Sequence, residues 1–174
     1  MIRAIAAIDD RLGLATDTGI PWNVPADVAH FRAMTASSNV LMGYATYAEF
    51  ERPMPERINY VATRRGEALR TGFVGVDDLG SFLSDGLVGD IWVIGGAMVY
   101  ASTLPFVQEL SLTRVQGDFG CTKFFPPFET SFRLATDAVP RAADGVPAIR
   151  IQTWQRDLGL SRSKEAEDRS SSSS

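Results

Sequence analysis

The stretch Ile20-Pro21-Trp22-Asn23-Val24-Pro25-Ala26-Asp27-Val28-Ala29-His30-Phe31 combines a helix start with an acid in unusual surroundings. Proline is favoured at the first helical position, because its φ is preset and its missing N–H would have no partner there. A helix is therefore predicted to begin at Pro25, with Asp27 in its first turn. At helical spacing, the face that carries Asp27 also carries His30, Phe31 and Met34.

Two interpretations of Asp27 follow from this pattern. A first-turn acid can be a solvated side chain that interacts with the helix dipole, which is worth between a few tenths of a kcal/mol and about 1 kcal/mol. Alternatively, it is a carboxylate in an apolar pocket, where desolvation raises its pKa and it pairs with a cationic or amidine-like heterocycle. The local pattern leaves both open, so the rest of the chain has to decide.

Length and composition limit the classes of protein to consider. The 174 residues are 45% hydrophobic, which predicts one domain that buries roughly two thirds of its unfolded surface. The net charge is -4 and no basic cluster could follow a phosphate backbone, so we expect no nucleic-acid partner. There is no signal-peptide pattern and no apolar run approaching about 18 residues, so we expect a cytoplasmic protein with no membrane partner.

The chain has one cysteine, Cys121, and one histidine, His30. Within one chain these exclude a disulfide, a cysteine zinc site and a multi-histidine site, so no metal is expected. A Ser-His-acid triad would have to use His30, whose position beside Phe31 is more typical of packing or a pocket wall. Hydrolytic chemistry is therefore disfavoured.

Apolar runs bounded by turn residues predict strands that alternate with helices. Strands are predicted at 2–8, 39–43, 58–63, 72–76, 90–94 and 109–115, and a closing antiparallel pair at 132–137 and 148–155. Helices are predicted from Pro25, over 44–50, from an Asp77 cap through Ser84, and from Gly96 to a stop at Pro105. This order predicts an α/β fold: a mostly parallel central sheet with an antiparallel C-terminal edge hairpin and helices on both faces.

The segments outside these elements carry further expectations. The loop 9–19 is predicted to be a mobile flap over the Asp27 pocket, because it joins a core strand to the stretch quoted above. An aromatic and proline-rich loop is expected at 121–128. The domain is expected to span 1–157. A disordered serine-rich tail is expected at 158–174, because its composition cannot offset the entropy of ordering.

Three predicted strand ends carry groups that bind phosphate. Gly43 and the pair Gly95-Gly96 each end a strand at the start of a helix, where free N–H groups and the helix dipole favour an anion. Arg64 and Arg65 follow a third strand, and arginine suits bidentate phosphate contacts. The carboxyl ends of parallel strands meet at one edge, so the three together predict a dinucleotide site without a Gly-x-Gly-x-x-Gly fingerprint.

Six stretches of the chain, taken in order, allow a comparison with known families. They are Ile5-Ala6-Ala7; 20–27 with Phe31; Val40-Leu41-Met42-Gly43 with Thr46; 52–59; Val93-Ile94-Gly95-Gly96 with Tyr100; and Leu112-Thr113. In this order and spacing they resemble the dihydrofolate reductase family over about residues 1–156. The resemblance implies hydride transfer from NADPH to C6 of 7,8-dihydrofolate with protonation of N5, which gives 5,6,7,8-tetrahydrofolate.

The resemblance implies catalytic and substrate roles residue by residue. Asp27 would anchor the pterin through its amino group and adjacent ring nitrogen, with Thr113 as hydrogen-bond partner. Trp22 would hold a water beside the pterin, and Arg57 would pair with the substrate's glutamate carboxylate. The walls of the pterin and benzoyl sites would be Ile5, Ala7, Val28, Phe31, Phe50, Met54 and Ile94, with Tyr100 beside them.

The same resemblance implies an NADPH site. Ala7, Ile20, Ile94, Gly95, Gly96 and Tyr100 would shape the nicotinamide site. The phosphates would lie along Gly43, Tyr44, Ala45 and Thr46, along Gly96, Ala97, Met98 and Val99, and along Thr63, Arg64 and Arg65. Tyr44 and Met98 stand where family members carry arginine, so Arg64 and Arg65 are expected to compensate, with NADH as the less favoured cofactor. The late loop Gly120-Cys121-Thr122 lacks the family's aspartate, so flap closure is expected to differ.

The chemistry agrees with these assignments. Hydride transfer needs two rings stacked at near-attack distance with bulk water excluded. A lone acid in an apolar wall raises the effective basicity of the pterin without supplying a nucleophile, and the proton is expected to arrive through water.

Two other functions remain open from the sequence. A reductase of the same fold could act on a ribosylated pyrimidine of riboflavin synthesis, although the presence of both Asp27 and Arg57 argues against it. A non-catalytic nucleotide- or folate-binding module is also possible, because the cofactor contacts are altered. A monomer is expected in each case.

Overall fold

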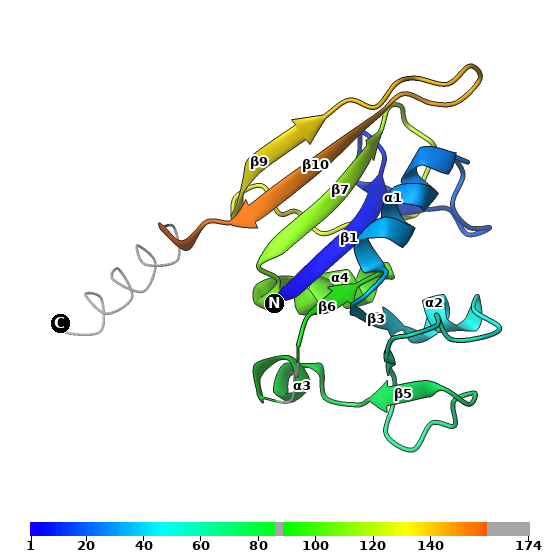
Figure 1. Ribbon diagram of the computed structural model, residues 1–174, viewed down its shortest axis with the longest axis vertical. Coiled ribbons are helices and arrows are strands. Elements are labelled where there is room, and N and C mark those ends of the chain that lie inside the picture. The colour runs from blue at the N-terminus through cyan, green and yellow to red at the C-terminus, as the bar shows by residue number, and fades with distance from the viewer. Residues whose placement is uncertain (86–88, 160–174) are drawn as a thin grey trace.

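The computed structural model describes residues 1–85 and 89–159, so the predicted tail lies, from residue 160 on, outside the described residues. An eight-stranded sheet runs in the order β5-β4-β3-β6-β1-β7-β10-β9 (Figure 1). Its strands are β1 (Ile2–Ile8), β3 (Asn39–Gly43), β4 (Asn59–Ala62), β5 (Phe73–Val76), β6 (Ile91–Val93), β7 (Glu109–Val115), β9 (Phe132–Ala138) and β10 (Ile149–Arg156).

The pairing of the strands confirms the predicted sheet. From β5 to β7, every neighbouring pair is parallel. β10 is antiparallel to both β7 and β9, which makes the C-terminal hairpin the antiparallel edge. Parallel strands need crossovers that cover the sheet, so both faces are expected to be packed by helices.

The alternation of side chains along β1 shows how the two faces are covered. Ile2, Ala4, Ala6 and Ile8 pack in one cluster with residues of α3 (Leu79–Asp85) and α4 (Ala97–Thr103). Ile5 lies in a second cluster, with Tyr47 of α2 (Tyr44–Ala48) and, packed against it, Phe31 and Met34 of α1 (Pro25–Thr35). Successive strand residues point to opposite faces, so α1 and α2 cover one face and α3 and α4 the other.

The predicted helix stop at Pro105 is confirmed, because α4 ends at Thr103 and Pro105 lies in the 3₁₀ turn that follows, Leu104–Phe106. Two other local predictions were wrong. The cap of α3 is Asp78 and not Asp77, because the Ser81 N–H donates to Asp78 Oδ1 at 3.0 Å. The loops at 9–19 and 121–128 contain β2 (Gly13–Ala15) and β8 (Lys123–Phe124), which form a two-stranded sheet.

Candidate active site

The helix start predicted at Pro25 is confirmed. Pro25 occupies the first turn of α1, Val24 is the N-cap residue and no side chain caps the helix. Trp22 and Val24 are buried, so the segment that leads into α1 is anchored before Asp27 is reached. The anchoring fixes where the first turn of α1 lies over the sheet.

Asp27 is half-buried against β7. Thr113 is buried, with 1% of the residue exposed, and its hydroxyl hydrogen-bonds the carboxyl group of Asp27. Burial raises the pKa of Asp27, while the Thr113 bond and the nearby His30 act in the opposite direction without cancelling the effect. The carboxyl group is therefore neither the solvated first-turn acid of the first interpretation nor a fully satisfied internal group.

A second polar contact lies one turn further along α1. His30 Nε2 and Ser111 Oγ are 2.8 Å apart, and Ser111 is buried on the same face of β7 as Thr113. Burial lowers the pKa of His30, with Asp27 acting against it, so the neutral imidazole is favoured. Ser111 was not predicted as a site residue, because its role depends on the contact between α1 and β7, which are far apart in the sequence.

The predicted apolar walls fall into two groups. One cluster contains Ile5, with Phe31, Phe50, Met54 and Ile94 packed against it. Trp22 lies in another cluster with Ala7 at its edge, and its ring meets that of Phe119 at 5.2 Å and 70°. Val28 of the predicted walls and Ile20 of the predicted nicotinamide site are exposed, so these two side chains face solvent.

Arg57 is fixed at the far end of α1. Its Nη1 donates to the Thr35 carbonyl at 2.5 Å and to the Thr35 hydroxyl at 3.2 Å, and its Nε donates to the Pro55 carbonyl at 2.9 Å. The guanidinium is thus oriented by backbone groups and by the helix that carries Asp27. Its remaining donors can bind a carboxylate in a fixed geometry.

The two glycine turns are brought together by a direct backbone contact. The Gly43 N–H donates to the Gly95 carbonyl at 2.7 Å, and a Cβ on Gly43 would lie 2.8 Å from Val99 Cγ2. Gly95 has φ +118° and lies against the Tyr100 ring, and the Tyr100 hydroxyl donates to the Ile5 carbonyl at 2.6 Å. The carboxyl ends of β3 and β6 therefore meet beside the middle of β1, with a cis peptide at Gly95-Gly96.

The third group of predicted phosphate residues, Thr63, Arg64 and Arg65, lines a separate hollow. A cavity of about 170 Å³ is lined by Thr63, Arg64, Arg65, Gly66, Glu67, Gly75 and Asp77. The cavity also contains two acids that were not predicted to lie there, Glu67 and Asp77. Arg65 Nε is 3.7 Å from Asp77 Oδ2, and Glu67 hydrogen-bonds the Tyr44 hydroxyl. Met98 is 83% exposed at the start of α4 and contributes no charge to this edge.

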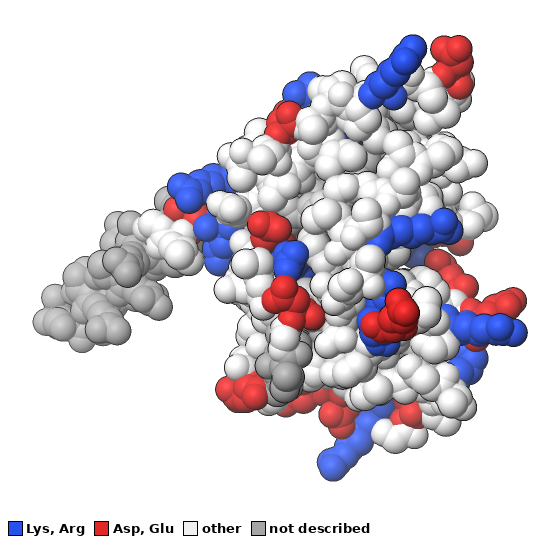
Figure 2. Space-filling model, viewed as in Figure 1, with Lys and Arg blue, Asp and Glu red and all other residues white. Residues whose placement is uncertain are grey.

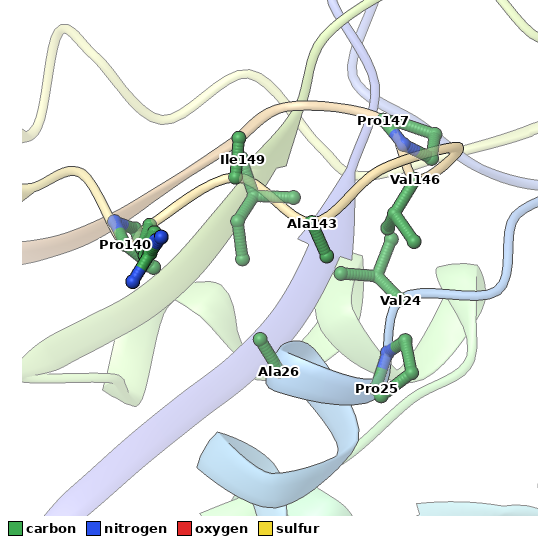
Figure 3. Close-up of a pocket in the computed structure, with 10 residues that line it drawn as sticks. Val24, Pro25, Ala26, Pro140, Ala143, Val146, Pro147 and Ile149 are labelled. Carbon is green, nitrogen blue, oxygen red and sulfur yellow. The ribbon is translucent and has the colours of Figure 1, made fainter.

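An apolar cavity of about 100 Å³ lies beside the start of α1 (Figure 3). In Figure 3, Val146 of the β9–β10 connection points toward Val24. The lining residues are Val24, Pro25, Ala26, Pro140, Arg141, Ala142, Ala143, Val146, Pro147 and Ile149, none of which is a predicted substrate residue. This cavity is therefore distinct from the place where the predicted residues meet.

Other features of the described residues set the context of the site. In this part of the chain, no group of three or more His, Cys, Asp or Glu side chains could hold a metal ion. No helix between residues 1 and 85 or between 89 and 159 is long and apolar enough to cross a membrane. Acidic and basic side chains are interspersed over the face in Figure 2.

The topology and the candidate site together define a class of protein: an α/β domain in which one half-buried acid and two glycine turns lie toward the carboxyl edge of the parallel strands, where ligands bind in such sheets. Within that class, the chain belongs to the dihydrofolate reductase family. A family model described as dihydrofolate reductase matches residues 1–156. The resemblance inferred from the six sequence stretches is thereby confirmed.

Individual relatives agree with this membership. Dihydrofolate reductase of Bacillus subtilis is 32% identical over 133 residues, which cover 75% of this chain and 79% of the relative. Dihydrofolate reductase of Mycobacterium tuberculosis H37Rv is 31% identical over 144 residues, which cover 80% and 75%. A structure described as dihydrofolate reductase from Enterococcus faecalis complexed with NADP(H) and RAB-propyl superposes with a TM-score of 0.82 at 23% identity. It covers 90% of this chain and 96% of that chain, and it confirms the fold.

Proposed function

We propose that this chain catalyses the NADPH-dependent reduction of 7,8-dihydrofolate to 5,6,7,8-tetrahydrofolate. The observation that carries the proposal is Asp27, a half-buried carboxyl group that has one hydroxyl partner in Thr113 and a raised pKa. Such a group keeps acceptor capacity for a ligand, because a carboxylate has more acceptor positions than one hydroxyl can use. The relatives named dihydrofolate reductase support this choice of reaction.

The chain's own residues would position the pterin and adjust its basicity. NADPH, when bound, supplies the hydride for C6 of the pterin. Asp27 would accept hydrogen bonds from the pterin amino group and the adjacent ring nitrogen, while Thr113 holds the carboxyl group in place. An acid that is costly to ionise by itself favours a cationic partner, so Asp27 would raise the basicity of the pterin. Trp22 would hold the water that brings the proton to N5.

The residues at the strand ends fit NADPH. The Gly43 and Gly95-Gly96 turns bring backbone close together without Cβ atoms, as a pyrophosphate requires, and Arg64 and Arg65 line the cavity proposed for the 2′-phosphate. We assign NADPH as the cofactor on this basis, with NADH as the less favoured one. Arg57, oriented by Thr35 and Pro55, would pair with the glutamate carboxylate, which favours folate over a ribosylated pyrimidine.

We also propose that the enzyme works as a monomer in the cytoplasm without a nucleic-acid partner. The net charge of -4 and the lack of a large basic cluster in the sequence support the last part of this proposal, that nucleic acid is not a partner. Size-exclusion chromatography with light scattering tests the monomer: a dimer mass at micromolar concentration would contradict it.

The direct test of the reaction is an absorbance assay of NADPH oxidation with purified protein. Oxidation is expected with dihydrofolate and not with the ribosylated pyrimidine, and it is expected to be faster with NADPH than with NADH. Binding of NADPH without any oxidation in the presence of dihydrofolate would instead support the non-catalytic module.

A further inference from the structure

Asp9, at the end of β1, is a charged side chain that the proposed reaction does not use. Asp9 is 1% exposed, and hydrogen-bond donors of the protein surround its carboxylate in place of water. Oδ1 accepts from the Arg11 N–H at 2.9 Å and from the Gly13 N–H at 2.7 Å, while Oδ2 accepts from the Phe119 N–H at 3.2 Å. The Cys121 thiol adds a fourth hydrogen bond.

These four donors come from two different loops. Arg11 and Gly13 belong to the loop 9–19, which was predicted to be a flap, and Phe119 and Cys121 belong to the loop before β8. Gly13 must lack a side chain here, because a Cβ would lie 2.7 Å from Asp9 Oδ1 and 2.6 Å from Cys121 Cβ. One buried carboxylate therefore joins the two loops at their base.

The contact continues from Asp9 to the wall of the candidate active site. The Phe119 N–H is bound to Asp9, and the Phe119 ring packs edge-on against Trp22 at 5.2 Å. Trp22 is buried and lies five residues before Asp27 in the chain. The position of Trp22 thus depends on Phe119, and the position of Phe119 depends on Asp9.

We propose that Asp9 is a positioning residue of the reductase: it clasps the loop 9–19 to the loop at 116–121 and so holds Trp22 beside the reacting rings. This inference rests on the proposed function for its kinetic part. Burial by itself raises the pKa of Asp9, but the bonds from Phe119, Gly13, Arg11 and Cys121 outweigh burial and lower it. The clasp is therefore charged throughout the neutral range.

The neighbouring residue Asp10 provides a matched control. Asp10 also accepts a hydrogen bond from the second loop, from the Gly117 N–H at 2.9 Å, but it is exposed and the backbone bond from its own N–H to the Gly117 carbonyl would remain. Water can replace the lost acceptor at Asp10 and cannot reach Asp9. Asp9→Asn and Asp10→Asn therefore each remove one negative charge from the same loop. The two sites differ in that solvent reaches Asp10 and not Asp9.

The test compares steady-state kinetics and amide hydrogen exchange of the two variants, at a temperature where their circular dichroism matches that of the wild type. Asp9→Asn is expected to lower kcat about 10-fold to 100-fold, because small displacements of positioning groups have effects of this size. The Asn amide keeps one acceptor oxygen for Arg11 and Gly13 but turns an NH2 group toward the Phe119 N–H, so the Phe119 amide is expected to exchange faster while those of β1 stay protected. Asp10→Asn is expected to stay within about 3-fold of the wild-type kcat.

A second variant follows the proposed path if Asp9→Asn does not fold. Phe119→Leu keeps the N–H that binds Asp9 but removes the ring on Trp22, so a similar loss of kcat with unchanged exchange at Gly13 is expected. An unchanged kcat in folded Asp9→Asn or in Phe119→Leu would overturn the inference. If wild-type protein does not turn over dihydrofolate, the proposed function fails, and unchanged exchange at Phe119 in Asp9→Asn would then separately refute the clasp.

Discussion

Asp9 and Asp27 are two acids that are at least partly buried, and they differ in how many hydrogen-bond donors surround the carboxyl group. Asp9 has donors on both carboxylate oxygens and a lowered pKa. Asp27 has one hydrogen-bond partner, the Thr113 hydroxyl. This bond and the nearby His30 do not cancel the effect of burial, so the pKa of Asp27 is raised. The difference indicates that a carboxylate whose acceptors are filled holds the fold together, whereas one with few donors is available for a ligand.

The largest effect is expected from Asp27→Asn. If Asp27 is the group that the ligand completes, kcat/KM at neutral pH should fall at least about 100-fold, with partial recovery at lower pH, where the pterin is more often protonated beforehand. The pH dependence of kcat/KM measures this, and an unchanged affinity for NADPH is the control for the fold. Normal turnover at neutral pH would remove Asp27 from the mechanism and break the comparison.

The same two acids should differ in their contribution to stability. Asp9→Asn removes hydrogen bonds to a buried charge and is expected to lower the free energy of unfolding by about 1.5–3 kcal/mol at neutral pH. Asp27→Asn is expected to leave it unchanged or raise it, because the folded state binds the Asp27 proton more tightly than the unfolded state does. Urea unfolding at several pH values measures both.

The pH dependence of these differences has a defined sign. The penalty from ionised Asp27 appears as pH rises from the unfolded-state value, about 3.9, through the raised folded-state pKa, so any gain in Asp27→Asn should vanish at lower pH. The stability from Asp9 is present above that unfolded value and is lost only as pH falls through its lowered pKa. Equal losses of stability in both variants at neutral pH would contradict the contrast.

The exposed ion pair of Arg65 and Asp77 is a third case to compare with the two buried acids. Arg65 lies 3.7 Å from Asp77 with its side chain 94% exposed, so this ion pair is worth little in water. Replacing Arg64 and Arg65 together by Ala is expected to weaken NADPH by about 3-fold to 10-fold, less at high salt, and NADH much less. Fluorescence titration with both cofactors measures this, and Arg52→Ala in another loop is the control. Equal losses for the two cofactors would mean that the 2′-phosphate is bound elsewhere.

The contrast between the acids also shows what the sequence could and could not provide. The strands of the sheet and the helix that begins at Pro25 were predictable, because apolar runs and a first-turn proline are local signals. For Asp27 the sequence left two interpretations open, a solvated first-turn acid and a carboxyl group in an apolar pocket. The contact of Asp27 with Thr113 of β7 and its burial favour the second. Asp9, Ser111 and the acids Glu67 and Asp77 were missed, since their roles depend on partners far away in the chain or across a loop. The two-stranded sheet of β2 and β8 was missed because its strands are three and two residues long.

The smallest effect is expected when the hydroxyl group that binds Asp27 is removed. Thr113→Val keeps the shape of the side chain but removes the hydroxyl that stabilises ionised Asp27, so the pKa of Asp27 should rise further. The corresponding step in the pH profile of kcat/KM is expected to move to higher pH, with a loss of at most about 10-fold at neutral pH. Ser111→Ala is the matched control, because its hydroxyl lies on the same face of β7 but contacts His30 at 2.8 Å. If Ser111→Ala moves the step in the pH profile as far as Thr113→Val does, His30 affects the charge of Asp27 as strongly as Thr113 does. The difference between Asp27 and Asp9 then depends on two partners of Asp27 and not on one.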